Sequence, residues 1–509
     1  MAGIRVSGMY SGLDTESIIS ELASARSVKI QSMEKAQTKL SWKIDAWKEL
    51  NTKIYDLYSD TLSSLRFTSS YSKKTTTASD SSKVSVTTSS DAMNAVQSLQ
   101  ITNLAKTGYM TGGKISTTDG TSATTSTTLA DLGITSDSIT FNLGFGTDGS
   151  SDVTELTFTS ESTISDVLSS LKEAGVNATF DATNQRLFIS STESGASANF
   201  VLSAADGSED ALELLGLSTT STDEDLKAVK ITGEDATIIL NNATFTSSSN
   251  TFEVNGLTLT VSDTTDDDET ITLTTANDTS GIYDMIKDFL SKYNELIIEM
   301  DTLYNADDAS DYMPLTSEEK DAMSDTEVEE WETKIKESLL RRDSTLYSVA
   351  NAMKSAMAAG IEMSDGTTMY LSDLGINKLS YFSAEDNEKY VYHIDGDEDD
   401  SDTKNNTDKL LAAITSDPDK VTEFFTSLTS SVYSALTSKM SSTELSSAFT
   451  VYNDKQLKSQ LEDYAEDIED AQDKLDDYID RWYDKFTAME TALAKLQSNS
   501  SAVSSLLGS

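Results

Sequence analysis

The sequence has no cysteine and only one histidine among its 509 residues. The absence of cysteine excludes disulfide bonds, thiolate metal sites and cysteine nucleophiles. A single histidine excludes histidine-rich metal sites, and a Ser-His-Asp triad could form only through His393. This residue lies in YVYHIDGDEDD, where alternating apolar residues predict a strand that runs into an acidic turn. A catalytic role for His393 is therefore disfavoured.

Basic side chains are also scarce. Lysine and arginine number 38 against 85 aspartates and glutamates, so the net charge at pH 7 is −47. This argues against binding to nucleic acid, because little is present to neutralise phosphates, and against adsorption to anionic lipid. We interpret the charge mainly as a source of solubility.

Long apolar runs are absent as well. None approaches the roughly 18 residues of a membrane span, so we predict no membrane insertion. The first residues, MAGIRVSGMYSGLDTESII, lack the charged-then-apolar layout of a secretory signal. Export would then use another route.

What the sequence does contain is apolar residues at helical spacing. The stretch LSWKIDAWKELNTKIYDLYSDTLSSL, residues 40–65, predicts one stripe along a helix. We expect this helix to begin at Asp14, a favoured N-cap, and to continue to about Arg66 with a break near 26–30. The stripe consists of Leu40, Ile44, Trp47, Ile54, Tyr58 and Leu65.

Two further stretches carry heptad patterns. In 281–305 the pattern has Ser280 as its expected N-cap and includes Ile282, Ile286, Phe289 and Leu296. Over 461–497 it is strict enough to favour a coiled coil over an ordinary surface helix. One row there is Ile468, Leu475, Trp482, Met489 and Leu496, and its companion is Ile479, Phe486 and Leu493.

Shorter helices are expected between these stretches, one capped by Asp343 and one beginning at Asp417-Pro418. Residues 72–278 instead read as short strands. TFEVNGLTLTV is a hairpin around Asn255-Gly256, and ETITLTT can add a strand beside it. Residues 116–128 are a Ser/Thr tract, expected to be a linker or long loop.

These patterns predict an α+β multidomain chain. Both chain ends and a central helix form a coiled-coil or bundle leg, with the first and last helices antiparallel, and two β-rich head domains are inserted. The expected segments are a flexible end (1–30), a leg helix (31–70), a discontinuous first head domain (71–115 and 226–278), an inserted outer head domain (116–225), a helical body with a small β part (279–450), a C-terminal leg helix (451–497) and a flexible tail (498–509).

No motif points to chemistry. Gly108, Gly113 and Lys114 match a phosphate loop, but Ile115 stands where Ser or Thr is needed and no helix can follow. The acidic run DGDEDDSD differs from a calcium-binding loop in two ways: its glycine is Gly396 instead of a residue after the third acid, and Asn406 stands at the twelfth position, where a glutamate is needed. No carboxylate pair for glycoside hydrolysis stands out. We therefore expect no enzyme activity, no cofactor and no metal.

Several segments resemble one known family. IRVSGMYSGLDTESIISEL is similar to the opening of flagellar filament cap proteins, the FliD or hook-associated protein 2 family. YMPLTSEEKDAMSDTEVEEWETKIKESLLRRDSTL, DLGI, SDPDKVTEFFT and RWYDKFTAMETALAKLQSNSSAVSSLLG resemble later parts of the same family. The likeness covers about the first 70 residues and most of 240–509, while the insert near 116–225 carries no specific motif.

The resemblance implies a non-enzymatic role. Such proteins form a homo-oligomeric ring, of about four to six subunits, at the distal tip of the flagellum. They guide flagellin into the filament, leave the cell through the flagellar type III apparatus, and meet a hook–filament junction protein and an export chaperone. The alternatives are another flagellar axial or junction protein, or a surface adhesin whose head binds mucin or glycans.

Overall fold

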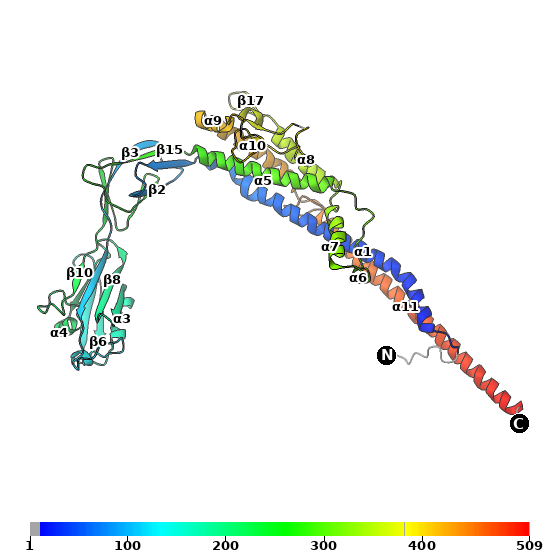
Figure 1. The fold of residues 1–509 in the computed structure, drawn as a ribbon, viewed down its shortest axis with the longest axis horizontal. Coiled ribbons are helices and arrows are strands. Elements are labelled where there is room, and N and C mark those ends of the chain that lie inside the picture. The colour runs from blue at the N-terminus through cyan, green and yellow to red at the C-terminus, as the bar shows by residue number, and fades with distance from the viewer. Residues whose placement is uncertain (1–10, 381, 508–509) are drawn as a thin grey trace. The chain divides into compact units, whose positions relative to one another are not determined.

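The structure is a computed structural model that describes residues 11–380 and 382–507. The chain forms two compact units (Figure 1). The helical unit combines the chain up to Tyr71 with everything from Thr279 onward, and the β-rich unit is Ser72–Asp278. The predicted α+β class, with helices from both chain ends and an inserted β-rich part, is confirmed.

The helical unit is built from long helices and a few two-residue strands. Its elements are α1 (Thr15–Asp56), the π-helical η1 (Leu57–Leu62), α2 (Ser63–Leu65), η2 (Thr68–Tyr71), α5 (Thr279–Asn305), α6 (Ser317–Asp321), α7 (Asp325–Glu337), α8 (Ser344–Ala358), β16 (Ile361–Glu362), β17 (Thr368–Met369), η4 (Leu371–Leu374), β18 (Ile376–Asn377), β19 (His393–Ile394), α9 (Lys409–Ser416), α10 (Pro418–Lys439) and α11 (Asp454–Leu507).

The first helix begins where the sequence predicts. The Asp14 side chain accepts a hydrogen bond from the backbone N–H of Ser17 and caps α1. The break predicted near 26–30 is wrong, because α1 is continuous from Thr15 to Asp56. No glycine or proline interrupts that span, so the backbone has no reason to leave the helix.

Other helix ends are set by the same kind of contact. Asp343 caps α8, and Asp417 caps α10 with Pro418 in the first turn, as predicted. Ser280 is not an N-cap: α5 already begins at Thr279, so Ser280 lies inside the first turn.

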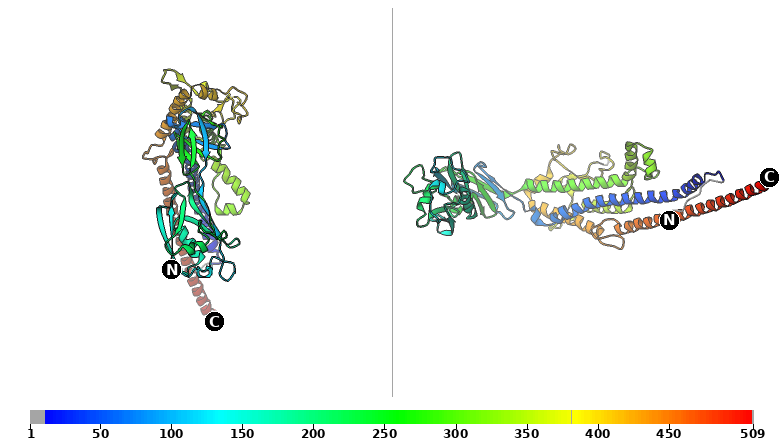
Figure 2. Two further views of the ribbon diagram at one scale, coloured as in Figure 1. Left: turned by 90° about the vertical axis from the view of Figure 1, so that its left-hand side faces the viewer. Right: turned by 90° about the horizontal axis from the view of Figure 1, so that it is seen from below.

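The core of the helical unit lies around the second half of α1. There α1 and η1 pack against α5, α8 and α10, and Figure 2 shows α1 and α5 side by side from a second direction. Within η1, Tyr58 stacks on Tyr433 of α10 with ring centroids 4.3 Å apart, and their hydroxyls are hydrogen-bonded at 2.8 Å. The members of this core contributed by the first helical stretch are Trp47, Leu50, Ile54, Leu57, Tyr58, Leu62 and Leu65.

The β-rich unit holds two apolar cores, each enclosed by antiparallel sheets. The first lies between a five-stranded sheet, β1-β15-β3-β11-β12, and a three-stranded sheet, β13-β14-β2. These strands are β1 (Lys74–Ala78), β2 (Val84–Thr88), β3 (Ala95–Asn103), β11 (Ala236–Leu240), β12 (Ala243–Ser247), β13 (Thr251–Val254), β14 (Leu257–Val261) and β15 (Ile271–Asn277).

The predicted hairpin is confirmed, since β13 and β14 pair through a turn in which Asn255 and Gly256 have φ of 51° and 78°. The prediction that ETITLTT lies beside this hairpin is wrong. That segment is β15, which pairs with β1 and β3 in the other sheet, while β2 pairs with β14. Pairing with distant strands leaves no signal in local alternation.

The second core lies between β10-β4-β8-β7 and β6-β5-β9 with α3 packed alongside. Its elements are β4 (Thr107–Lys114), η3 (Ala130–Leu132), β5 (Ile139–Phe145), β6 (Ser151–Phe158), α3 (Ile164–Glu173), β7 (Val176–Asp181), β8 (Arg186–Ser194), β9 (Phe200–Ala204), α4 (Glu209–Leu214) and β10 (Val229–Ile231). The loop at 116–128 is packed here, because Gln185 exchanges two hydrogen bonds with the buried Ala123 backbone. The finer division into head domains stays a prediction.

Candidate functional site

The first and last helices form an antiparallel pair (Figures 1 and 2). Trp47 of α1 stacks on Tyr452, just ahead of α11, with ring centroids 5.3 Å apart and planes 8° from parallel. Toward the start of α1, the Arg26 guanidinium lies 3.8 Å from the ring centroid of Tyr478. Toward the start of α1, the contacted residues of the last helix therefore have higher residue numbers, which means that the two helices run antiparallel.

Polar groups close both ends of the paired region. At one end, the hydroxyl of Ser11 donates to the buried carboxylate of Glu490. At the other, Asn51 accepts from the backbone N–H of Val451 at 2.9 Å and donates to the carbonyl of Phe449 at 3.3 Å. Asn51 is a polar residue that interrupts the predicted apolar stripe. This interruption was the only sign in the sequence that the residue contacts another segment.

The predicted packing residues differ widely in burial. Those in the body of the helical unit are buried: Trp47, Ile54, Tyr58, Leu65, Ile282, Ile286, Phe289 and Leu296. Leu40 and Ile44 of α1 are half-buried. Of the predicted packing residues on α11, Ile468 alone is buried, and the half-buried members are Leu475, Ile479, Trp482, Phe486, Met489 and Leu493.

The last of the predicted packing residues, Leu496, is 64% exposed. The α11 stripe is therefore covered on one side only, by α1. The side chains of the stripe keep contact with water on the flank that α1 does not cover. Whether the whole set packs as one coiled coil stays a prediction.

The two predicted stripes are offset from each other along the antiparallel pair. The stretch 40–65 does not lie along 468–496 as a whole: Leu40 lines the same hollow as Tyr464, and Trp47 meets Tyr452. The partners of 468–496 lie earlier in α1, while the later part of α1 packs against α5, α8 and α10. Identical heptad spacing in each helix fits many registers, so the sequence pattern alone could not choose among them.

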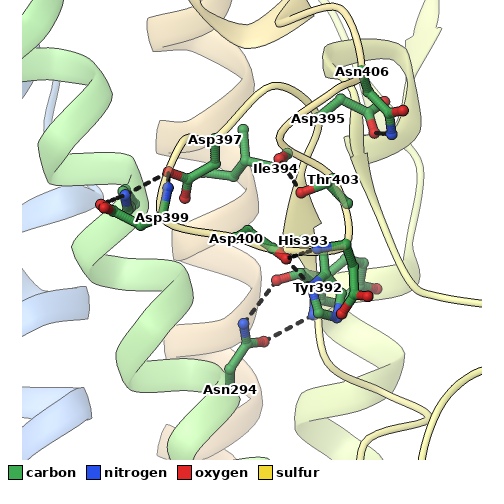
Figure 3. Close-up of polar contacts among 12 residues, drawn as sticks. Asn294, Tyr392, His393, Ile394, Asp395, Asp397, Asp399, Asp400, Thr403 and Asn406 are labelled. Carbon is green, nitrogen blue, oxygen red and sulfur yellow. Dashed lines mark hydrogen bonds and ion pairs between the residues drawn. The ribbon is translucent and has the colours of Figure 1, made fainter.

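The acidic loop after β19 is neutralised by a lysine. Lys287 of α5 makes ion pairs of 2.6 Å with both Asp397 and Asp399. Figure 3 labels the two aspartates. Burial lowers the pKa of Lys287, but its hydrogen bonds to the two carboxylates outweigh burial and raise the pKa above its ordinary value. Two carboxylates that a calcium site in this loop would use are therefore paired with a lysine.

His393 lies beside the same loop. Its Nδ1 is 2.7 Å from Asp400, and the Thr403 hydroxyl donates to the carbonyl of Ile394 (Figure 3). Burial raises the pKa of Asp400, but the hydrogen bond with His393 and others outweigh it and lower the pKa. No serine takes part in these contacts, so the geometry of a Ser-His-Asp triad is not formed.

The phosphate-loop match lies within a strand. Gly108, Gly113 and Lys114 belong to β4, and a Cβ at Gly113 would lie 2.2 Å from the backbone carbonyl carbon of Leu226. Close packing of two backbones explains this glycine. Within residues 11–380 and 382–507 there is no cluster of three metal-ligating side chains, and no helix is long and apolar enough to cross a membrane.

The paired terminal helices, with a half-exposed apolar stripe, and the β-rich insertion between them define an α+β protein whose chain ends come together in one helical unit. Two family models match the chain. The one for the C-terminus of flagellar hook-associated protein 2 covers residues 233–498, and the one for its N-terminus covers 11–108. The chain belongs to the flagellar hook-associated protein 2 family.

Curated relatives carry the same description. Flagellar hook-associated protein 2 of Escherichia coli K12 is 29% identical over 476 residues, covering 91% of this chain and 90% of that protein. The one from Halalkalibacterium halodurans is 24% identical over 439 residues, covering 82% and 78%.

Two of the solved structures to which this chain is similar are flagellar cap proteins. The flagellar cap protein FliD from Escherichia coli, domains D1–D2–D3, is 21% identical with a TM-score of 0.49, covering 78% of this chain and 96% of that one. FliD (HAP2) from Pseudomonas aeruginosa PAO1 is 22% identical with a TM-score of 0.31, covering 42% and 93%.

Proposed function

We propose that this protein caps the distal tip of the growing bacterial flagellar filament and promotes the insertion of flagellin subunits. It is a non-enzymatic assembly factor that acts by packing and shape. The observation that carries the proposal is family membership over residues 233–498. It is supported by the α11 stripe, which stays half-exposed in the single chain and so is available to other helices.

The proposed partners follow from this role. Copies of the chain assemble into a ring of about four to six subunits. The ring contacts flagellin and the hook–filament junction protein. The monomer leaves the cell through the flagellar type III apparatus, held beforehand by an export chaperone. Its net charge of −47 helps to keep exported monomers apart.

We further propose a role for each expected segment. The leg helices, 31–70 and 451–497, meet the filament, while 71–115 with 226–278 and the inserted 116–225 form the head domains. In the assembled cap, the half-buried residues of α11 become covered by helices of other subunits. Burying a fully exposed apolar side chain adds about 1.5–3 kcal/mol, and a side chain that is already half-buried gains about half of that. Six such residues together still supply a driving force of several kcal/mol, roughly 5–9 kcal/mol before the entropy cost of association.

Deleting the gene tests the role itself. The expected result is short or absent filaments with flagellin in the medium, restored by the wild-type gene. Filaments of normal length in the deletion strain would contradict the proposal. Electron microscopy gives the filament length, and immunoblotting of the medium gives the lost flagellin.

A matched pair of variants tests the stripe. Phe486 is half-buried on the stripe, and Thr487 beside it is exposed. Phe486→Asp places a charge where assembly would bury it, so complementation should fail. Thr487→Asp adds the same charge to the solvent side and should complement. Equal complementation by both variants would exclude the stripe as an assembly surface.

A further inference from the structure

A hollow of about 490 Å³ opens in the helical unit beside α1. It lies where α1, the segment ahead of α6, the turn between α7 and α8, and the start of α11 meet. Apolar side chains form part of its wall, and Met313 among them is 36% exposed. The apolar residues that line it are Ala36, Leu40, Ala309, Met313 and Leu339.

Three cations reach the same hollow, in a chain that is strongly acidic overall. Lys43 pairs with Asp343 at 2.9 Å, and Arg341 lies 3.7 Å from Asp308. Lys39 has no ion pair within the part of the chain that the structure describes. Its charge nevertheless acts locally. The pKa of Asp308 is lowered mostly by hydrogen bonds from Ser310, and the positive charges of Arg341 and Lys39 lower it further.

The acidic counterpart is on α11. Residues 462–477 hold nine aspartates and glutamates, all exposed, against the single basic residue Lys474. In the described ranges, the ion pairs of this segment are those with Lys458 and Lys474 of the same helix. Five of the acids follow one another at spacings of four and three residues and so form one ridge: Glu462, Glu466, Glu469, Asp473 and Asp476.

This acidic ridge cannot fill the hollow of its own chain. On α11 the side chains of Ile468 and Leu475 face α1, and the ridge lies about a third of a turn away from them. Tyr464 of the same helix already forms part of the wall of the hollow. The ridge is therefore presented outward, where only another molecule can meet it.

We propose that the hollow and its cations receive the acidic ridge of α11 from a second copy of this chain. One surface meets a different surface, so the contact repeats from copy to copy and closes into a ring when the rotation allows. The inference rests on the proposed function, because it describes how copies of the cap protein join. Charge complementarity selects the second copy as the occupant.

The test measures self-association of the full chain by analytical ultracentrifugation. Attraction between exposed charges is screened over about 10 Å at 0.1 M salt, so association should be stronger at about 0.05 M than at about 0.5 M salt. Lys39→Glu should weaken association about tenfold at low salt. Lys48→Glu changes a residue on the same helix that forms an ion pair with Asp45 at 3.5 Å, and it should leave association unchanged.

A charge swap makes the test specific. Glu469→Lys, on the exposed ridge, should weaken association alone, and together with Lys39→Glu it should restore it. Three results would each overturn the inference: both single variants associate like wild type, the double variant associates more weakly than either single variant, or wild type stays monomeric at low salt. If Lys39→Glu failed to fold by circular dichroism, Glu469→Lys at its exposed position would still decide.

The two proposals fail in different ways. If the gene deletion shortens filaments but the charge variants associate like wild type, the protein is a cap whose copies join elsewhere. If the variants behave as expected but deletion leaves filaments normal, the interface stands and the capping role falls.

Discussion

Replacing Trp47 by alanine should strongly destabilise the helical unit. The side chain is 2% exposed and stacks on Tyr452 with ring centroids 5.3 Å apart. Removing a buried aromatic side chain typically costs about 3–5 kcal/mol, including the cavity left behind. Loss of the stacked pair accounts for about 0.5–1.5 kcal/mol of such a cost. We therefore expect a loss of about 4 kcal/mol in the free energy of unfolding.

Trp42 on the same helix supplies the control. It is half-buried, and the Lys336 ammonium lies 4.6 Å from its ring centroid. Trp42→Ala removes partial burial and an exposed cation–π contact, so we expect a loss of about 1–2 kcal/mol. Both variants can be compared with wild type by urea unfolding followed through helical circular dichroism. The shift in midpoint at constant slope gives the change in stability.

The comparison can refute the reasoning directly. If Trp47→Ala cost no more than Trp42→Ala, then Trp47 would not hold the start of α11 against α1. The antiparallel register built on that contact would fall with it.

Three further changes follow from the same structure. Trp482→Asp should lower the unfolding free energy of the monomer by about 2 kcal/mol, because the side chain is half-buried there, as Trp42 is. Urea titration measures this loss, and a loss several times larger would mean that the row is buried. The pKa of Asp365 is lowered to about 2, mostly by a hydrogen bond from the Thr367 hydroxyl and to a smaller extent by one from the Thr367 backbone N–H. Its stabilising effect is present above pH 3.8 and is lost as the pH falls toward 2, so the stability difference between wild type and Asp365→Asn should shrink over that interval of acid titration. Gly256→Ala should lower the thermal stability more than Gly120→Ala, although the two glycines have nearly the same φ, +78° and +79°. A Cβ at Gly256 would lie 2.8 Å from the backbone nitrogen of residue 92, whereas one at Gly120 would meet nothing within 4 Å. Equal losses of stability would contradict this.

Local patterns predicted the elements of this fold better than their partners. Asp14, Asp343 and Asp417 cap helices as expected, because a cap depends on residues within one turn. The turn at Asn255-Gly256 was predictable for the same reason.

Long-range pairing was not predictable in this way. The strand at 271–277 joins β1 and β3 instead of the adjacent hairpin, and nothing in its alternation distinguishes the two outcomes. The link from Asn51 to Val451 joins residues 400 positions apart. A polar residue within an apolar stripe indicates a partner without saying where that partner lies.

Burial of the candidate site was the least predictable feature. Trp47 and Trp482 occupy equivalent places in equally regular patterns, yet the first is 2% exposed and the second is half-buried. The difference comes from the surroundings: Trp47 lies where other helices of the body close over α1, whereas Trp482 has α1 on one side only. A sequence pattern reports which face is apolar but not how many neighbours cover it.

The contact between Ser11 and Glu490 has a practical consequence for labelling. Because it brings the first described residue and a late part of α11 to one place, a bulky label attached beside either residue would crowd the other. Short epitopes are better inserted at the exposed loop 266–268 of the β-rich unit, away from this contact in sequence. Donor and acceptor dyes at the exposed residues Leu13 and Thr491, beside this contact, would form a close pair whose energy transfer reports any separation of the helices during assembly.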